Sequence, residues 1–227
     1  QYYHGTTVPP IGAGPFAVRY SPTLVTNTNN TGAGSLRQAI TDVPAGGAIY
    51  FDPSLNGATI TLGVTQLTIG KNLTIDASAL VAGITVNGNN TSRVFEVLAG
   101  TNVALSNLTI TLGNASTGAG INNLGTLELA DCTISENTAS GRGGGIRNEP
   151  TTGNLIFTRG SILNNTADLG GGISSLGGAI PDLDNGIELR NVTISGNSTT
   201  GGAGGGIFHQ LSFVRLYSCT ITDNVAA

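Results

Sequence analysis

The carboxylates are the side chains of this chain with the clearest capacity for chemistry. The 227 residues include 13 Asp or Glu, 9 Lys or Arg and two His. Asp182 and Asp184 share one loop, and neighbouring carboxylates can bind Ca²⁺ or exchange protons with a substrate. This loop lacks the full twelve-residue calcium pattern and its terminal Glu. A Ca²⁺ site at Asp182 and Asp184 is therefore kept open beside the simpler interpretation of a turn, and no other cofactor is expected.

The other reactive side chains stand apart from one another. His4 and His209 have no evident partner in the sequence. The glycine runs precede strand-like segments and not a helix whose N-terminus could hold a phosphate. No nucleophile motif is present. We therefore expect no catalytic residue and no metal site, and we predict that the protein is not an enzyme.

Cys132 and Cys219 are the only two cysteines. The repeat described below places them three coils apart in one column, which at roughly 4.8 Å per coil separates them by about 14 Å. A disulfide tolerates at most about 7 Å between its Cα atoms. We expect two free thiols that pack in the interior as small apolar side chains.

Charge and hydropathy narrow the class of protein. The net charge is −4 and Lys71 is the single lysine, which argues against a nucleic-acid partner because such proteins present a basic surface. Apolar residues make up 39% of the chain but occur in short groups, so no membrane span is expected. The start at Gln1 and the absence of Met indicate a mature exported chain or an excised fragment.

A repeat of about 25 residues dominates the sequence. One tetrapeptide recurs in variants that end in Ile, and beyond the first copy these Ile residues are spaced by 24, 28, 32 and 27 positions. Apolar residues alternate before each Ile, as on strands with one buried face. A second signature, Gly-Gly-Gly-Ile or Gly-Ala-Gly-Ile, follows 11 to 13 residues later. The tetrapeptides begin at Asn72, Asn107, Asp131, Arg159, Asn191 and Ser218.

Each period thus holds three short strands and three turns. Strands this short cannot bury a core alone, so successive coils must stack and pair in parallel. We predict an all-β fold, a right-handed parallel β-helix of about six or seven three-strand coils and roughly 30 Å in length. Asn side chains should stack at the corners, where they tolerate turn backbone. One column begins with Asn72 and Asn107, and a second comprises Asn137, Asn165, Asn197 and Asn224.

The segment near residues 35–43 is the one convincing helix. Ser35 followed three residues later by Gln38 is a capping-box pattern. We expect this helix to cover the first coil, because an open end of a β-helix exposes unpaired strand edges. Residues 1–26 are assigned to an N-terminal extension and candidate donor strand, and residues 27–227 to a single β-helix domain.

Two groups of motifs resemble a known class of protein. The run GSLRQAI extends from Gly34 to Ile40, and Ile-x-x-Asn, as in Ile134 to Asn137, alternates with Gly-Gly-Gly-Ile. Over about residues 23–227 the chain resembles secreted bacterial right-handed parallel β-helix repeat proteins that carry a GSLRxAI-type N-terminal motif. Its repeats are similar to those of polymorphic outer-membrane proteins, whose usual forms are Gly-Gly-Ala-Ile and Phe-x-x-Asn. The resemblance implies the fold and an exported location, secreted or at the cell surface, and adhesins are common in such families.

Nine Asn-x-Ser/Thr sequons occur along the chain. Several follow automatically from the repeat consensus. In a host that glycosylates secreted proteins, corner positions could carry sugars without disturbing the core. The candidates are Asn72, Asn107, Asn114, Asn164, Asn191 and Asn197.

The preferred functional hypothesis is a non-enzymatic extracellular structural or adhesive solenoid that forms head-to-tail filaments by strand addition. Phe16, Val18 and Tyr20 alternate in a strand-like segment that could pair with the open edge of a neighbouring copy. Leu216 and Ile221 lie in the last coil, at that edge. The same segment could instead fold back on its own first coil. The partner would then be the protein itself, or surface glycans in the case of an adhesin.

Two other functions are kept open. Pectate lyases and related enzymes share the β-helix architecture, so a polysaccharide-active enzyme or a glycan-binding module is one alternative, although few acidic residues coincide in adjacent coils. Outward Thr at alternate positions, as at Thr109 and Thr111, resembles the flat face of an ice-binding solenoid. Asp76 and Leu163 interrupt that pattern, and exposed parallel strands prefer Thr in any case.

Overall fold

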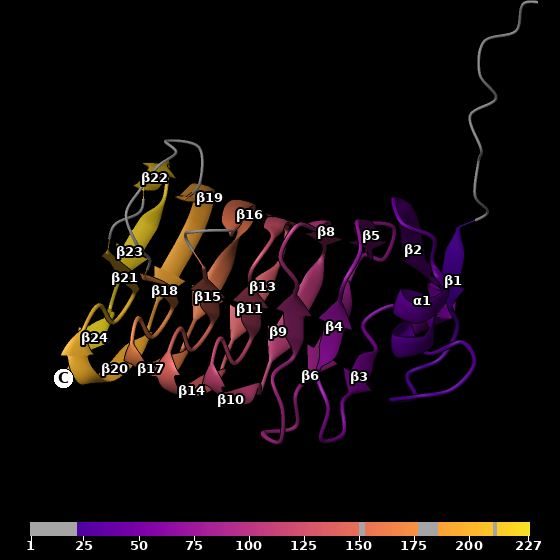
Figure 1. Ribbon diagram of the computed structural model, residues 1–227, viewed down its shortest axis with the longest axis horizontal. Helices are drawn as coiled ribbons and strands as arrows, with labels where there is room; N and C mark the ends of the chain where they lie inside the picture. The colour runs from indigo at the N-terminus through magenta and orange to yellow at the C-terminus, as the bar shows by residue number, and fades with distance from the viewer. Residues whose placement is uncertain (1–21, 150–152, 177–185, 211–212) are drawn as a thin grey trace, which may run out of the picture.

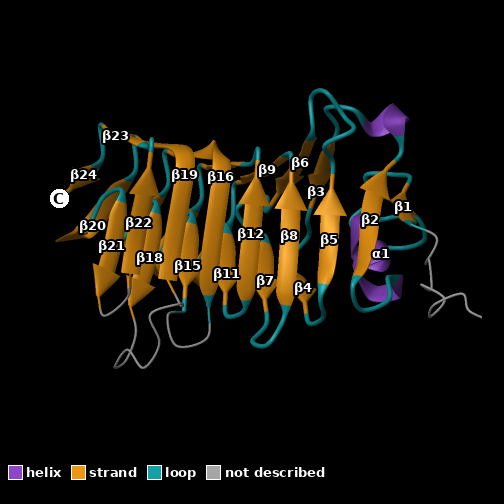
Figure 2. Ribbon diagram, turned by 90° about the horizontal axis from the view of Figure 1, so that it is seen from above, coloured by secondary structure: helices purple, strands orange, loops and turns teal. Residues whose placement is uncertain are grey.

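The computed structural model describes residues 22–149, 153–176, 186–210 and 213–227. These residues form an elongated parallel β-solenoid of about seven turns with one α-helix at its N-terminal end (Figure 1). Seen from above, the strands cross the long axis and lie side by side from coil to coil (Figure 2). The predicted β-helix and its number of coils are confirmed.

Four rows of parallel strands line the coils, and each row takes one strand from each of several successive coils. The first row is β1 (Thr23–Val25), β2 (Gly47–Phe51), β5 (Leu73–Asp76), β8 (Asn102–Ser106), β12 (Thr126–Ala130), β16 (Asn154–Leu163), β19 (Gly186–Ser195) and β22 (Phe213–Tyr217). The second row is β3 (Thr59–Thr61), β6 (Ile84–Asn87), β9 (Leu108–Thr111), β13 (Thr133–Ser135), the second halves of β16 and β19, and β23 (Thr220–Thr222).

The third row is β10 (Asn114–Thr117), β14 (Thr138–Arg142), β17 (Thr166–Leu169), β20 (Ser198–Ala203) and β24 (Val225–Ala226). The fourth row is β4 (Leu67–Ile69), β7 (Phe95–Val97), β11 (Ile121–Asn123), β15 (Ile146–Asn148), β18 (Ile173–Leu176) and β21 (Ile207–Gln210). A short 3-10 helix, η1, spans Pro53–Leu55.

The third row places strands where the repeat predicted turns. The side chains that face inward in this row are small. Ala139 pairs with Ala115, and the equivalent residue one coil later is Ala167. A column of Ala carries a weak hydrophobic signal in the sequence, and the paired residues shift register within each pair of third-row strands from β10 to β20. The row is therefore hard to recognise from alternation alone.

Asn72 lies at a different corner from the one expected. Strand β5 pairs with β8, so that Leu73 is opposite Val103 and not opposite Leu108. Strand β9 pairs instead with β6. The sequence Asn-Leu-Thr-Ile thus occurs at two different corners of the coil. Asp76, which follows the first copy, therefore lies in the first row and does not interrupt the Thr pattern of the second row. Asn72 accepts a hydrogen bond from the N–H of Asn102 at 2.8 Å, which is its true neighbour in the stack.

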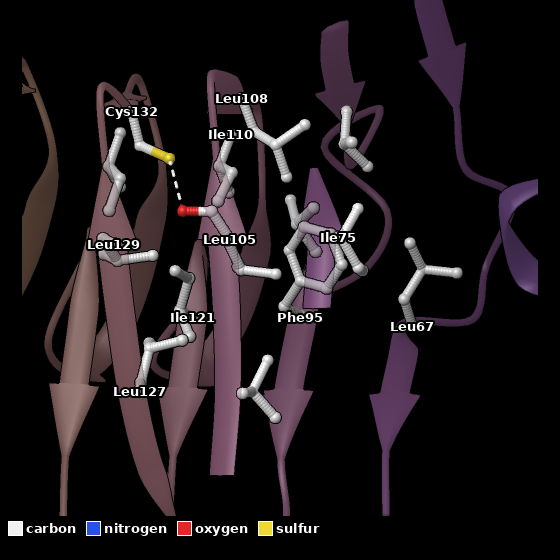
Figure 3. Packing of buried hydrophobic residues seen from close by; sticks show 14 of the residues in the cluster. Leu67, Ile75, Phe95, Leu105, Leu108, Ile110, Ile121, Leu127, Leu129 and Cys132 are labelled. Carbon is white, nitrogen blue, oxygen red and sulfur yellow. Dashed lines mark hydrogen bonds between the residues drawn. The ribbon is translucent and has the colours of Figure 1, made fainter. Parts of the chain in front are cut away.

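The core is a continuous column of aliphatic side chains along the solenoid axis. Ile110, Ile134, Ile162 and Ile194 are each 0% exposed and lie one above another through the pairing of successive second-row strands. Figure 3 shows how such residues from several coils meet in the interior. Burial of one Leu or Ile side chain stabilises a fold by about 1.5–3 kcal/mol, so the stacked columns supply the main favourable term.

The corner between the first and second rows holds one residue per coil in the left-handed backbone region. Its φ angles are 55° at Asn107, 55° at Asp131, 53° at Arg159, 53° at Asn191 and 53° at Ser218. Asn and Asp tolerate this conformation better than other residues with a side chain. The requirement explains why this position in the tetrapeptide is polar and favours Asn.

The corner between the second and third rows holds a buried ladder of Asn side chains. Asn137 donates from Nδ2 to Oδ1 of Asn165 at 2.9 Å, Asn165 to Asn197 at 2.9 Å, and Asn197 to Asn224 at 2.8 Å. Each Oδ1 also accepts the backbone N–H of the Asn before it, at 3.0 Å in each case. The predicted column of Asn137, Asn165, Asn197 and Asn224 is therefore a hydrogen-bonded stack.

Helix α1 (Leu36–Asp42) covers the N-terminal end and buries Leu36, Ala39 and Ile40. The Ser35 side chain caps it by accepting the N–H of Gln38. The Gln38 side chain bonds Asp42 at 2.7 Å and does not reach back to Ser35, whose N–H already donates to the carbonyl of Gly32 at 3.2 Å. Half of the predicted capping box is therefore formed.

Strand β1 belongs to the solenoid, although it lies within the range 1–26 assigned to an extension. It pairs in parallel with β2, with Val25 opposite Phe51. The ordered sheet thus begins at least as early as Thr23. Among the described residues no helix is long and apolar enough to cross a bilayer.

Both cysteines are free. Cys132 is 1% exposed, and its thiol donates to the carbonyl of Leu105 at 3.5 Å (Figure 3). Burial raises the pKa of this thiol to about 11. Cys219 is only half-buried, contrary to the expectation that both thiols lie in the interior, because no coil follows it among the described residues.

Candidate assembly edge and surface sites

The last coil exposes apolar residues that earlier coils bury. Leu216 pairs with Leu189 and Ile221 with Ile194. Leu216 and Ile221 are 44% and 48% exposed, whereas Leu189 and Ile194 are 0% exposed. Val225 is 56% exposed. The inward columns of the core therefore end in an apolar surface formed by β22, β23 and β24, which we term the terminal rung.

The strands of the terminal rung are paired on one side only, as far as the described residues show. Within the described residues, β22 and β23 pair only with β19, and β24 pairs only with β20. The N–H of each earlier Asn in the ladder donates to the next Oδ1, but the N–H of Asn224 has no acceptor among the described residues. In the described part of the chain, the rung thus presents the N–H of Asn224 without an acceptor beside exposed apolar side chains.

Several predicted site residues fall outside the described residues. The donor-strand residues Phe16, Val18 and Tyr20 lie there, as do Asp182 and Asp184 of the candidate Ca²⁺ loop. In the described part of the chain, no group of three or more His, Cys, Asp or Glu is placed to hold a metal ion.

A polar network that the sequence did not reveal covers the fourth row. Arg93 contacts Glu96 at 3.2 Å, Asn122 donates to Glu96 at 3.2 Å, and Arg147 donates to Asn122 at 3.0 Å. Arg147 also pairs with Glu149. Burial lowers the pKa of Arg93, and the nearby Glu96 opposes that effect. These groups satisfy one another across successive coils, which suits a stabilising role.

Two shallow depressions lie on the outward face of the first row. The larger, of about 420 Å³, is lined by residues of β5, β8 and β12, among them Thr74, Asn102 and Glu128. The smaller, of about 140 Å³, continues toward β16, and both are lined by Ala104 and Glu128. Sequence reasoning missed this face. The signal was the small outward residues Ala104 and Ala130, which alternate with buried Leu.

The second row carries a line of outward Thr residues, but these are not all the residues that the sequence predicted. Thr109 is opposite Thr85 and not Thr74, and the row also includes Thr59 and Thr61 of β3. Asn87 and Leu163 interrupt it. Thr111 is only 9% exposed, so the face is less open than a regular Thr array would be.

Some of the Asn-x-Ser/Thr sites are exposed, whereas others have Asn side chains that are hydrogen-bonded within the fold. Asn197 is 0% exposed and bonded within the ladder, so it cannot carry a sugar in this fold and is withdrawn as a candidate. Asn107 is half-buried, and its Nδ2 donates to the carbonyls of Ala77 and Leu80 at 3.1 and 2.6 Å, so a sugar there would cost both bonds. The exposed candidates are Asn72, Asn114, Asn164 and Asn191.

Comparison of the chain with protein-family models, with curated proteins and with solved structures gave no match. The geometry of the described residues and the sequence motifs are therefore the basis for assigning a function.

Proposed function

We propose that the protein is a non-enzymatic extracellular structural or adhesive solenoid that associates with copies of itself through the terminal rung. The observation that carries the proposal is the exposure of Leu216 and Ile221, 44% and 48%, at positions that are fully buried one coil earlier. The motifs similar to those of exported β-helix repeat proteins support a secreted or cell-surface location.

A second chain on the terminal rung would gain both apolar burial and backbone hydrogen bonds. Exposed sheet edges recruit strands because their N–H and C=O groups are already arranged for pairing. Full burial of a Leu or Ile contributes about 1.5–3 kcal/mol. In a longer chain a further coil would occupy this edge, and in the 227-residue chain the occupant would be a second copy. In the strand-addition form of the proposal, the donor is the segment that contains Phe16, Val18 and Tyr20.

Charge at the terminal rung tests the proposal directly. The variants Leu216→Lys and Ile221→Lys place a cation where the neighbour would pack, and Lys on an edge strand opposes edge pairing. We expect the wild-type chain to sediment as assemblies in analytical ultracentrifugation, and both variants to sediment as monomers. Electron microscopy should show the same contrast.

Val81→Lys is the matched control, because Val81 is 98% exposed and lies far from the terminal rung in the sequence of coils. It should assemble as the wild type does. Deletion of residues 1–22 then separates two modes: loss of assembly indicates a donor strand, and retained assembly indicates direct packing between ends. A wild-type chain that stays monomeric at all concentrations would refute the proposal.

A further inference from the structure

The polar groups around the larger first-row depression are free to bind a ligand. Asn72 uses its Oδ1 to accept the N–H of Asn102, which leaves its Nδ2 without an acceptor among the described residues. In the same part of the chain, the side chains of Thr74, Asn102, Thr126 and Glu128 make no hydrogen bond. The fourth row differs, because Glu96, Asn122 and Arg147 there bond one another.

The floor of the two depressions combines small, apolar and acidic side chains, because Glu128 lies between Ala104 on one side and Ile156 on the other. Ala104 and Ala130 project outward with small side chains, and Ile156 borders the smaller depression. Small apolar side chains beside hydroxyl, amide and carboxylate groups fit a ring that has C–H faces and hydroxyl edges. Ligand sites commonly combine apolar area with a few placed polar groups in this way.

Charge and backbone pairing restrict the class of ligand. Glu128 is the only ionisable residue that lines either depression, so an anionic ligand would meet repulsion without any compensating cation. Strands β5, β8 and β12 are each paired on both sides, so their backbone groups are not available for strand addition by a peptide.

We propose that this face binds a neutral oligosaccharide that lies along the solenoid axis, with Asn102 and Glu128 bonding its hydroxyls and Ala104 beneath a ring. The two depressions extend from Gly46, in the turn before β2, to β16. Four coil intervals of about 4.8 Å give a length of about 19 Å, which suits several linked sugars. The site lies on a lateral face and is independent of assembly at the terminal rung.

Titration of the ¹⁵N-labelled full chain tests the proposal. The probes are neutral tetrasaccharides of glucose, mannose and xylose, with tetragalacturonate and spermine as charged comparisons. We expect at least one neutral series to shift the amide signals of β5, β8 and β12. Ala104→Tyr, which fills the shared part of the depressions, should weaken that binding at least about tenfold, and Glu128→Ala should do the same because charge-assisted hydrogen bonds are strong.

Two controls match these variants. Thr109→Tyr adds the same ring at an outward position of β9, and Glu136→Ala removes an exposed carboxylate at another corner. Both should bind as the wild type does, and circular dichroism should show the wild-type fold for all four variants. The proposal is overturned if no neutral tetrasaccharide shifts those amides at about 10 mM, which would fill even a millimolar site. Binding of spermine alone, or equal binding by Ala104→Tyr and Thr109→Tyr, would overturn it as well.

Discussion

Asn165 shows how one side chain connects three coils. Its Oδ1 accepts two hydrogen bonds from Asn137, at 3.0 and 2.9 Å. Its Nδ2 donates to the carbonyl of Ile134 and to Oδ1 of Asn197, both at 2.9 Å. The residue is 0% exposed, so water cannot replace any of these partners in the folded state.

Asn165→Ala should therefore destabilise the protein by about 3 kcal/mol or more, because each buried polar group left without a partner costs about 1–3 kcal/mol. Urea denaturation measures the loss. Asn164→Gly is the control: Asn164 is exposed with φ 53°, and Gly adopts that conformation without strain. If the two variants differ by less than about 0.5 kcal/mol, the ladder contributes little.

The two thiols should differ in reactivity. Because burial raises the pKa of Cys132 to about 11, its reactive thiolate is scarce at pH 8. In the folded, monomeric Leu216→Lys variant, iodoacetamide at pH 8 should modify Cys219 within minutes and spare Cys132, as mass spectrometry can show. Because the folded state raises the pKa of Cys132 from 9.0 to about 11, the neutral thiol contributes to the stability of the fold below pH 9. That contribution is lost as the pH rises through 11. Rapid labelling of Cys132 at pH 8 would contradict the burial of its side chain.

At the scale of elements, the Gly-Gly-Gly-Ile signature is explained by close contact between coils. A Cβ added to Gly144 would lie 2.4 Å from the carbonyl oxygen of Thr166 and 2.5 Å from that of Gly171. The neighbours are backbone atoms of the next coil, which cannot move without disturbing the third row. Glycine at this corner is thus a packing requirement.

Gly144→Ala should accordingly destabilise the fold by about 3 kcal/mol, the upper end of the usual cost of overpacking, because both contacts are with backbone atoms. Thermal unfolding followed by circular dichroism gives the comparison. Gly100→Ala is the matched variant, since a Cβ there meets nothing within 4 Å and only its φ of 76° is unfavourable, at about 1–2 kcal/mol. A larger loss at Gly100 than at Gly144 would show that backbone strain, and not contact between coils, governs these glycines.

At the scale of the whole molecule, the sequence predicts what repeats and misses what depends on neighbours in space. The column of Ile134, Ile162 and Ile194 follows from spacing alone, because each must face the same interior. The predicted corner of Asn72 is wrong, because its tetrapeptide matches that of Asn107 locally and only the pairing of whole coils distinguishes the two.

The surface sites were less predictable than the core. The first-row depressions arise where Ala104 and Ala130 are smaller than their neighbours. A depression of this kind has no recognisable motif in the sequence, because it depends on small side chains and not on reactive ones. The exposure of Leu216 and Ile221 depends on what lies beyond their coil. The sequence predicts that both residues lie at the edge. That they are exposed where their partners Leu189 and Ile194 are buried follows only from the register of the sheets.

The Asn ladder has a direction. The bonds between its side chains all run one way: Asn137, Asn165 and Asn197 each donate to the Asn of the next coil toward the C-terminus, so each of these bonds can polarise the next. At the N-terminal end of the stack, the N–H of Gly113 donates to Oδ1 of Asn137. At the C-terminal end, the N–H of Asn224 has no acceptor among the described residues. The two ends of the stack are chemically different, and any fibre built on this chain would have distinct front and rear ends.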